Sequence, residues 1–159
     1  MAYLAHLGPD GVGQRLQDHL LAVSRITAAH ASRIRLAEAG ALIGLLHDLG
    51  KYSAAFQNYL KSVTASDDTE SLERGSVDHS TAGAQYLWKS FKNSGSKESV
   101  VAELLALCIA SHHSGLIDCL DPSGTDKLTA RMEKADNSTH LQEVLPLIEP
   151  SVQQSLDRL

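Results

Sequence analysis

Apolar side chains recur at the spacing of an α-helix through most of this chain, and this periodicity restricts the possible folds more than any other feature. In residues 14–35 the apolar positions Leu16, Leu20, Val23 and Ile26 follow the 3.6-residue period of an amphipathic helix. We find no run with the two-residue alternation of a half-buried strand. The pattern predicts an all-α protein, a compact bundle of several helices.

A second helix is expected at residues 36–49, where apolar residues cover nearly the whole circumference. Such a helix is typical of the buried centre of a bundle, and Gly50 is a suitable stop. Ser53 can cap a third helix through about residue 62. Further helices are expected at residues 79–91 and 98–112.

The helix at residues 98–112 has a predicted inner face of five residues: Val101, Leu104, Leu105, Cys108 and Ile109. The polar stretch at residues 63–78 is typical of a surface loop, and residues 114–125 contain the glycines and proline of irregular structure. Two or three short helices are expected after residue 125. We expect the whole chain, residues 1–159, to form one domain.

Composition excludes some functions. The longest run of apolar residues and glycine, Ala39–Leu46, has eight residues, whereas a membrane span needs about 20. The two cysteines and the lack of a signal peptide predict reduced thiols in a cytoplasmic protein. The formal net charge of −5 argues against a polyanionic partner unless cations are supplied by other means.

Five of the eight histidines accompany one aspartate at predicted helix positions that can face a common centre. They are His19, the pair His47-Asp48, His79 and the pair His112-His113. Imidazole and carboxylate hold Mn, Fe, Co, Ni or Zn without any thiolate. Adjacent residues on a helix point about 100° apart, so each pair reaches one centre only near a helix end, where both pairs lie. The set predicts a metal site.

The segment His47-Asp48-Leu49-Gly50-Lys51 carries the most information. The two oxygens of Asp48 can bridge two cations, and Lys51 adds a compact positive charge suited to a phosphate oxygen. Two divalent ions add four positive charges and would bring the net charge from −5 to −1. Taken singly, each histidine is better explained as a core or surface residue; the spaced set favours metal. The other three histidines, His6, His30 and His140, are not accompanied by a comparable set of potential metal ligands, and we expect them to be structural or exposed.

Four segments resemble a known family, the HD nuclease domain of the type I CRISPR nuclease-helicase. They are residues 16–20 (LQDHL), 44–53 (GLLHDLGKYS), 78–83 (DHSTAG) and 111–116 (SHHSGL). The similarity extends over residues 5–118. The histidine-aspartate pair alone indicates only the HD superfamily of metal-dependent phosphohydrolases, whereas the double histidine followed by Ser-Gly favours the CRISPR branch.

The resemblance implies an HD-domain bundle with a central metal-binding helix and up to two divalent ions, Mn, Co, Ni, Fe or Mg. It implies that His19, His47 and Asp48 hold one ion, that Asp48, His79, His112 and His113 hold the other, and that Lys51 lies near the scissile phosphate. The implied activity is hydrolysis of phosphodiester bonds in single-stranded DNA, by endonuclease and exonuclease cleavage, during CRISPR antiviral defence. The implied partners are a helicase domain, in the same or another chain, and the RNA-guided surveillance complex.

One departure from the family pattern concerns the first ion. The family has a further metal-binding aspartate in an apolar helix well downstream of the double histidine. The surroundings of Asp157 do not match that helix, and no Gly-x-x-x-x-Gly-Lys helicase motif occurs. We therefore expect the chain to be an N-terminal piece of a longer nuclease or of a nuclease-helicase, with an incomplete first metal position and a more tightly bound second ion.

Two alternatives remain open at the level of sequence. The chain fits an HD-superfamily phosphohydrolase acting on a nucleotide, which requires a closed pocket with contacts to the base. It also fits a catalytically silent docking domain, because one metal position lacks a ligand. A nuclease requires an open groove instead.

Overall fold

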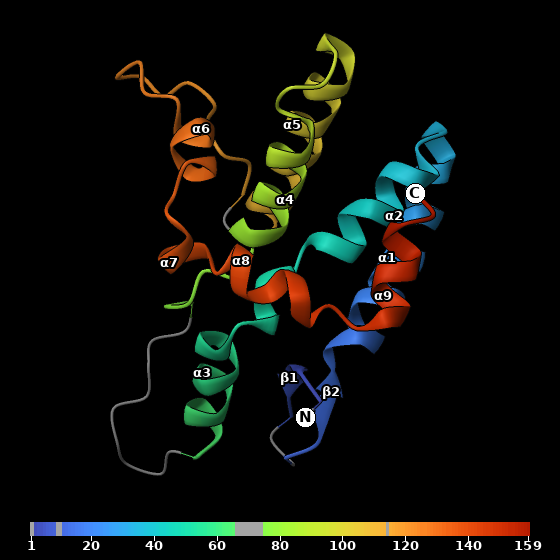
Figure 1. The fold of residues 1–159 in the computed structure, drawn as a ribbon, viewed down its shortest axis with the longest axis vertical. Coiled ribbons are helices and arrows are strands. Elements are labelled where there is room, and N and C mark those ends of the chain that lie inside the picture. Colours follow the sequence, from blue (N-terminus) through green and yellow to red (C-terminus); the bar gives the residue numbers. More distant parts are fainter. Residues whose placement is uncertain (1, 9–10, 66–74, 114) are drawn as a thin grey trace.

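The computed structural model describes residues 2–8, 11–65, 75–113 and 115–159, and this part of the chain is mainly helical (Figure 1). The helices are α1 (Leu16–Ala31), α2 (Ala37–Leu46), α3 (Ala54–Ala65), α4 (Thr81–Phe91), α5 (Ser96–Ser111), α6 (Lys127–Met132), α7 (Asp136–Thr139), α8 (Leu141–Val144) and α9 (Pro150–Leu156). Short 3-10 helices occupy Ser32–Ile34, Leu49–Tyr52 and Leu145–Leu147. The predicted all-α bundle is confirmed.

The prediction that the chain has no strands is wrong. Strand β1 (Leu4–Leu7) pairs antiparallel with β2 (Gly13–Arg15). Strands of four and three residues are too short to show the two-residue alternation of side chains, which is why the pattern missed them. The signal that could have revealed them is the cluster of Gly and Pro at residues 8–13, which is typical of a turn.

Two helix pairs form the body of the fold. Helices α1 and α2 pack along each other, and α4 and α5 form the second pair. Helix α9, red in Figure 1, returns from the far end of the sequence to lie against α1 and α2. The end of α2 and the 3-10 helix Leu49–Tyr52 connect the two pairs, since this 3-10 helix contacts α3, α4, α8 and β1.

Small residues bring α1 and α2 close together. A Cβ on Gly44 would lie 2.5 Å from the Cα of Ser24. The hydroxyls of Ser24 and Thr27 donate to the carbonyls of Ala41 and Gly40, at 3.0 and 2.6 Å. The contact face therefore passes through Ser24, and Ile26, which we predicted in the apolar stripe, is 57% exposed.

The predicted inner face of α5 is wrong in part. Ile109 is buried as expected, but Val101 and Leu104 are 53% and 56% exposed, and Cys108 is exposed. The buried side instead presents the small residues Ala102, Ala106 and Ala110, which allow α4 to pack closely. Helical periodicity shows which residues share a face, but a neighbouring helix decides which face is buried.

Some predicted boundaries shift. Helix α2 ends at Leu46 rather than 49, because the chain tightens into the 3-10 helix Leu49–Tyr52. Helix α3 continues to Ala65, past the predicted end at 62. Most of the predicted loop at residues 63–78 lies at 66–74, outside the described residues. No helix of the described part is both long and apolar enough to cross a membrane.

Candidate metal centre

The turn after α2 presents the central aspartate. His47 and Asp48 follow the last helical residue, and Asp48 has φ −112° and ψ 21°, outside the helical region. The turn packs on the segment before α4, where the Gly50 N–H donates to the His79 carbonyl at 3.0 Å. A Cβ on Gly50 would lie 2.5 Å from that carbonyl oxygen, so only glycine permits this approach.

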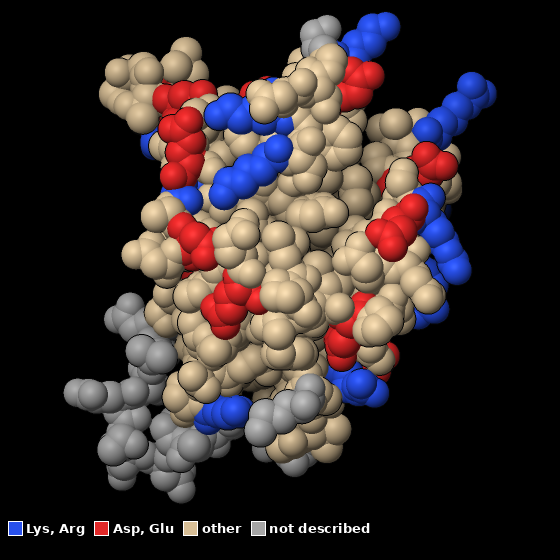
Figure 2. Space-filling view, in the orientation of Figure 1, with Lys and Arg blue, Asp and Glu red and all other residues tan. Residues whose placement is uncertain are grey.

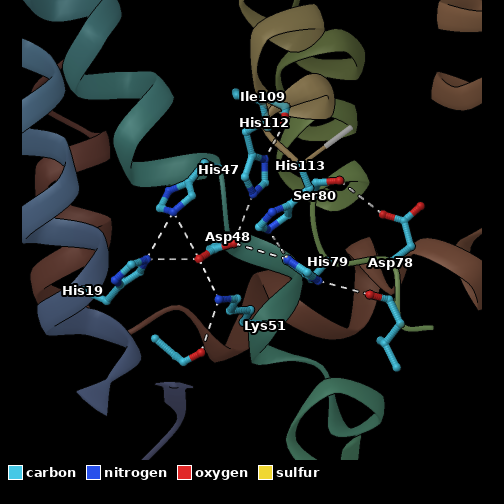
Figure 3. A network of polar contacts seen from close by, with 12 residues as sticks. His19, His47, Asp48, Lys51, Asp78, His79, Ser80, Ile109, His112 and His113 are labelled. Carbon is cyan, nitrogen blue, oxygen red and sulfur yellow. Dashed lines mark hydrogen bonds and ion pairs between the residues drawn. The ribbon is translucent and has the colours of Figure 1, made fainter. Parts of the chain in front are cut away.

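Side chains from separate elements converge on Asp48 (Figure 3). His19 of α1 and the neighbouring His47 place Nε2 at 3.0 and 3.1 Å from Asp48 Oδ2. His112, after α5, and His79, before α4, place Nε2 at 3.4 and 3.6 Å from Oδ1. The His113 Nε2 lies 2.8 Å from the His79 Nε2. The structure thus brings all six predicted metal ligands into one cluster.

The donors divide between the two carboxylate oxygens. On the Oδ2 side, the Nε2 atoms of His19 and His47 lie 3.2 Å apart. On the Oδ1 side, the donor atoms of Asp48, His79, His112 and His113 all lie within 4.8 Å of one another. Asp48 is therefore shared by two groups of donors.

Backbone carbonyls orient three of the rings. The Nδ1 atoms of His47, His79 and His112 lie 2.9, 3.1 and 2.7 Å from the carbonyl oxygens of Gly44, Val77 and Ile109. A carbonyl only accepts, so we assign the proton of each neutral ring to Nδ1. Each Nε2 then directs its lone pair toward Asp48, as in histidines that bind metals.

This arrangement fits a divalent cation. Lone pairs and a carboxylate that point at one another repel unless a positive charge lies between them. Asp48 is 2% exposed, and its Oδ1 has no hydrogen-bond partner within the described part of the chain. The His19 Nε2 atom lies 3.0 Å from Asp48 Oδ2 and 3.2 Å from the His47 Nε2, so these three donors are close enough for one cation to contact them all.

Without a metal, the Nε2 atoms can carry protons instead. Burial by itself raises the pKa of Asp48, but hydrogen bonds from the rings of His112, His19 and His47 outweigh burial and hold the pKa far below its ordinary value. Burial lowers the pKa of His79 to about 4. At neutral pH the cluster therefore offers an ionised carboxylate and a neutral His79 ring, the forms that bind metals.

Lys51 lies beside the cluster and is almost fully buried. Its Nζ is 2.9 Å from Asp48 Oδ2 and donates to the Ala5 carbonyl at 3.2 Å. It also lies 5.2 Å from the centre of the Phe56 ring. The ammonium holds strand β1 against the turn that carries Asp48.

The family model described as Cas3, HD domain, matches residues 5–157. The chain belongs to this family. A Cas3 HD domain is a metal-dependent hydrolase of the HD type, with a nucleic-acid substrate and a role in CRISPR systems. A comparison with curated proteins finds no match. Asp157 belongs to neither donor group, and its Oδ1 accepts from Gln153 Nε2 at 2.7 Å.

Sequence reasoning missed Asp78, a residue that positions His79 in this HD domain. The Asp78 carboxylate accepts from Thr81 N at 3.1 Å and from Thr81 Oγ1 at 2.7 Å, which caps α4. Burial alone raises the pKa of Asp78, but the hydrogen bonds from Thr81 and Lys134 lower it to about 2. An aspartate just before a helix was an available signal for this cap.

Arg131, in α6, and Lys134, in the turn after it, extend their side chains to the start of α4. Arg131 donates to Ser80 Oγ at 2.6 Å and to Thr81 Oγ1 at 2.8 Å, while the Lys134 Nζ lies 2.9 Å from Asp78 Oδ2. Some fifty residues separate them from Asp78 in sequence, so no local pattern could pair them.

The prediction that His6 lies away from the predicted metal ligands is wrong. Its ring lies 5.0 Å from that of His19, and its donor atom is within 4.8 Å of those of His19 and Asp48. The missed hairpin explains the error, because β1 carries His6 to the cluster. The expectation for the other two holds: His30 is exposed, and the His140 Nδ1 contacts Glu143 Oε2 at 2.9 Å.

The HD cluster opens onto a surface cleft of about 890 Å³. Its lining includes His79, His113, Lys51, Arg131, Lys134 and Tyr59. Figure 2 shows acidic and basic side chains interspersed over one face, with no continuous basic patch on that face. Within the cleft, positive charge comes from the lining residues Lys51, Arg131 and Lys134.

Proposed function

We propose that this HD domain cuts single-stranded DNA by hydrolysing phosphodiester bonds with two divalent ions, Mn, Co, Ni, Fe or Mg. The observation that carries the proposal is the convergence of five imidazoles on both oxygens of one buried carboxylate, Asp48, at the wall of an open cleft. A closed pocket for a free nucleotide would enclose its ligand, whereas an open cleft admits a continuing strand.

In this proposal His19, His47 and Asp48 hold the first ion, and Asp48, His79, His112 and His113 hold the second. When bound, such ions activate water for attack and stabilise charge on the attacking and leaving oxygens of an in-line displacement. The chain contributes a shared carboxylate that stays ionised and rings whose Nε2 lone pairs are already oriented by backbone carbonyls.

Lys51 is proposed as the residue that attracts the scissile phosphate. Its ammonium is fixed by Asp48 and the Ala5 carbonyl, and it forms part of the cleft wall. A fixed ammonium at a desolvated site stabilises charge that develops on a phosphate oxygen. Arg131 and Lys134, further along the cleft, share the single carboxylate of Asp78 and leave an excess of positive charge for the DNA backbone.

The biological setting follows from the family. We propose that a helicase domain feeds single-stranded DNA into the cleft and that the RNA-guided surveillance complex recruits the nuclease to a target in the cytoplasm. Degradation of the target would then serve antiviral defence.

One experiment tests the proposed activity against both alternatives. Labelled single-stranded DNA, a panel of deoxynucleotide triphosphates and cyclic dinucleotides are incubated with the protein in Mn²⁺, Co²⁺, Ni²⁺ or Mg²⁺. Asp48→Ala is the inactive control, and His30→Ala, an exposed histidine away from the cluster, is the matched control. We expect metal-dependent loss of DNA alone, abolished only by Asp48→Ala.

The other outcomes have distinct meanings. Turnover of nucleotides without DNA cleavage would establish the nucleotide phosphohydrolase. If every substrate survives, the same assay is repeated with an extended chain that includes the downstream aspartate: cleavage by that chain would attribute the failure to the missing ligand, and survival with both chains would favour a docking domain that has lost catalysis.

A further inference from the structure

We propose that His6 is a fourth protein ligand of the metal position formed by His19, His47 and Asp48. The inference rests on the proposed function, because it concerns the same ions. The His6 donor atom lies within 4.8 Å of those of His19 and Asp48, and its ring packs edge-on against that of His19, with centroids 5.0 Å apart.

The two metal positions are unequal without His6. Among the residues that the structure describes, the Oδ1 side has four protein donors, whereas the Oδ2 side has His19, His47 and the shared Asp48. Protein sites for such ions provide three donors when a position is left open and four when it is closed. Among the described residues, His6 is an additional histidine whose donor atom lies close to those of His19 and Asp48.

Strand β1 is anchored so that His6 faces the cluster. Ala5 is buried, and its carbonyl accepts from Lys51 Nζ at 3.2 Å. The Leu4 backbone makes two hydrogen bonds with the Gln57 side chain, at 3.1 and 2.9 Å. The register of β1 is irregular between Leu4 and His6, and Ala5, His6 and Leu7 all line the cleft, so this anchored stretch holds His6 beside the cluster.

The ring of His6 can move toward the metal position without breaking an existing hydrogen bond. Within the described part of the chain it makes no hydrogen bond, and its side chain is exposed. Its donor atom already lies within 4.8 Å of those of His19 and Asp48, so rotation of the exposed ring can bring it toward an ion that these residues would hold. His6 is exposed, as His112 and His113 are, but its donor atom must still move into place, so the Oδ2 position remains the weaker of the two.

Two variants separate ligation from packing. His6→Ala removes the ring, whereas His6→Phe keeps an aromatic ring against His19 but cannot bind a metal. His30→Ala is the matched control. Mn²⁺ binding to the chelator-treated protein is measured by isothermal titration calorimetry, and circular dichroism verifies that each variant is folded.

We expect the wild type to bind two Mn²⁺ ions with different affinities. Both His6 variants should lower the affinity for the more weakly bound ion by about tenfold or more and change the affinity for the tightly bound ion by less than about twofold. Unchanged binding in His6→Ala, or wild-type binding in His6→Phe, would overturn the role of His6 and leave the proposed function intact. A wild type that binds no Mn²⁺ refutes the proposed function and this ligand together.

Discussion

The ammonium of Lys51 lies 2.9 Å from Asp48 Oδ2, and the two side chains are only 4% and 3% exposed. Removing one partner of a buried ion pair leaves the other without compensation and typically costs about 3–5 kcal/mol. Here the rings of His112, His19 and His47 can also donate hydrogen bonds to Asp48, and a divalent ion can take the place of the lost ammonium.

We therefore predict that Lys51→Met destabilises the metal-free protein by about 3 kcal/mol and that Mn²⁺ restores much of the loss. Urea unfolding with EDTA and with Mn²⁺ measures both values. Lys89→Met, at an exposed position of α4, is the control and should change little. An equal loss with and without Mn²⁺ would contradict a cation site at Asp48.

Gly83 permits α4 to touch the end of α2. A Cβ at this position would overlap the carbonyl oxygen of Leu46, a backbone atom that cannot move away as a flexible side chain can. We predict that Gly83→Ala costs about 3 kcal/mol or more, because the helices must separate. At Gly13 the added Cβ meets only the ends of Leu4 and Leu7 side chains, so Gly13→Ala should cost far less. Similar unfolding midpoints for both variants would disprove this packing role.

Asp78 should stabilise the protein only above a certain pH. Its pKa is lowered to about 2 in the folded state, from an ordinary value of 3.8. A depressed pKa contributes stability above the unfolded value, and this contribution is lost as the pH falls from about 4 toward 2. We predict that Asp78→Asn costs about 2 kcal/mol at pH 6 and distinctly less at pH 3 in urea unfolding of the metal-free protein. A difference that does not change with pH would exclude this electrostatic role.

Lys134 is predicted to contribute one phosphate contact along the cleft. Each contact to single-stranded DNA adds about 0.7 to the slope of log affinity against log salt concentration. Lys134→Ala should reduce that slope by about 0.7, whereas Lys92→Ala, at an exposed position after α4, should leave it unchanged. Fluorescence anisotropy of labelled DNA in EDTA, where no cleavage is expected, measures the slope. Equal slopes for both variants would show that the DNA does not contact Lys134.

The candidate site was predictable to an unusual extent because its signals are local. His47-Asp48 and His112-His113 are adjacent pairs that come just after a run of helical periodicity, and a helix end is the place where neighbours can face one centre. His19 and His79 belonged to the same pattern of motifs. The residue types were sufficient to indicate metal chemistry, since imidazole and carboxylate groups are the ligands that divalent transition metals bind.

The contacts between distant segments were not predictable. The approach of His6 depends on a hairpin whose strands are too short to show a period. Asp78 meets Lys134 only because α6 packs on α4. The exposed Val101 and Leu104 show the same limit, since the alanines of α5, not its larger residues, set the distance to α4.

The amino-acid sequence by itself thus determined the helical class, the approximate positions of the main helices and the chemistry of the candidate ligands, because each depends on neighbours within a few turns. Only the tertiary structure decided which oxygen of Asp48 faces which rings, that Lys51 is buried against that carboxylate, and that His6 joins the cluster. Those facts depend on how closely helices can approach, and small residues such as Gly50 and Gly83 control that distance through contacts far apart in sequence.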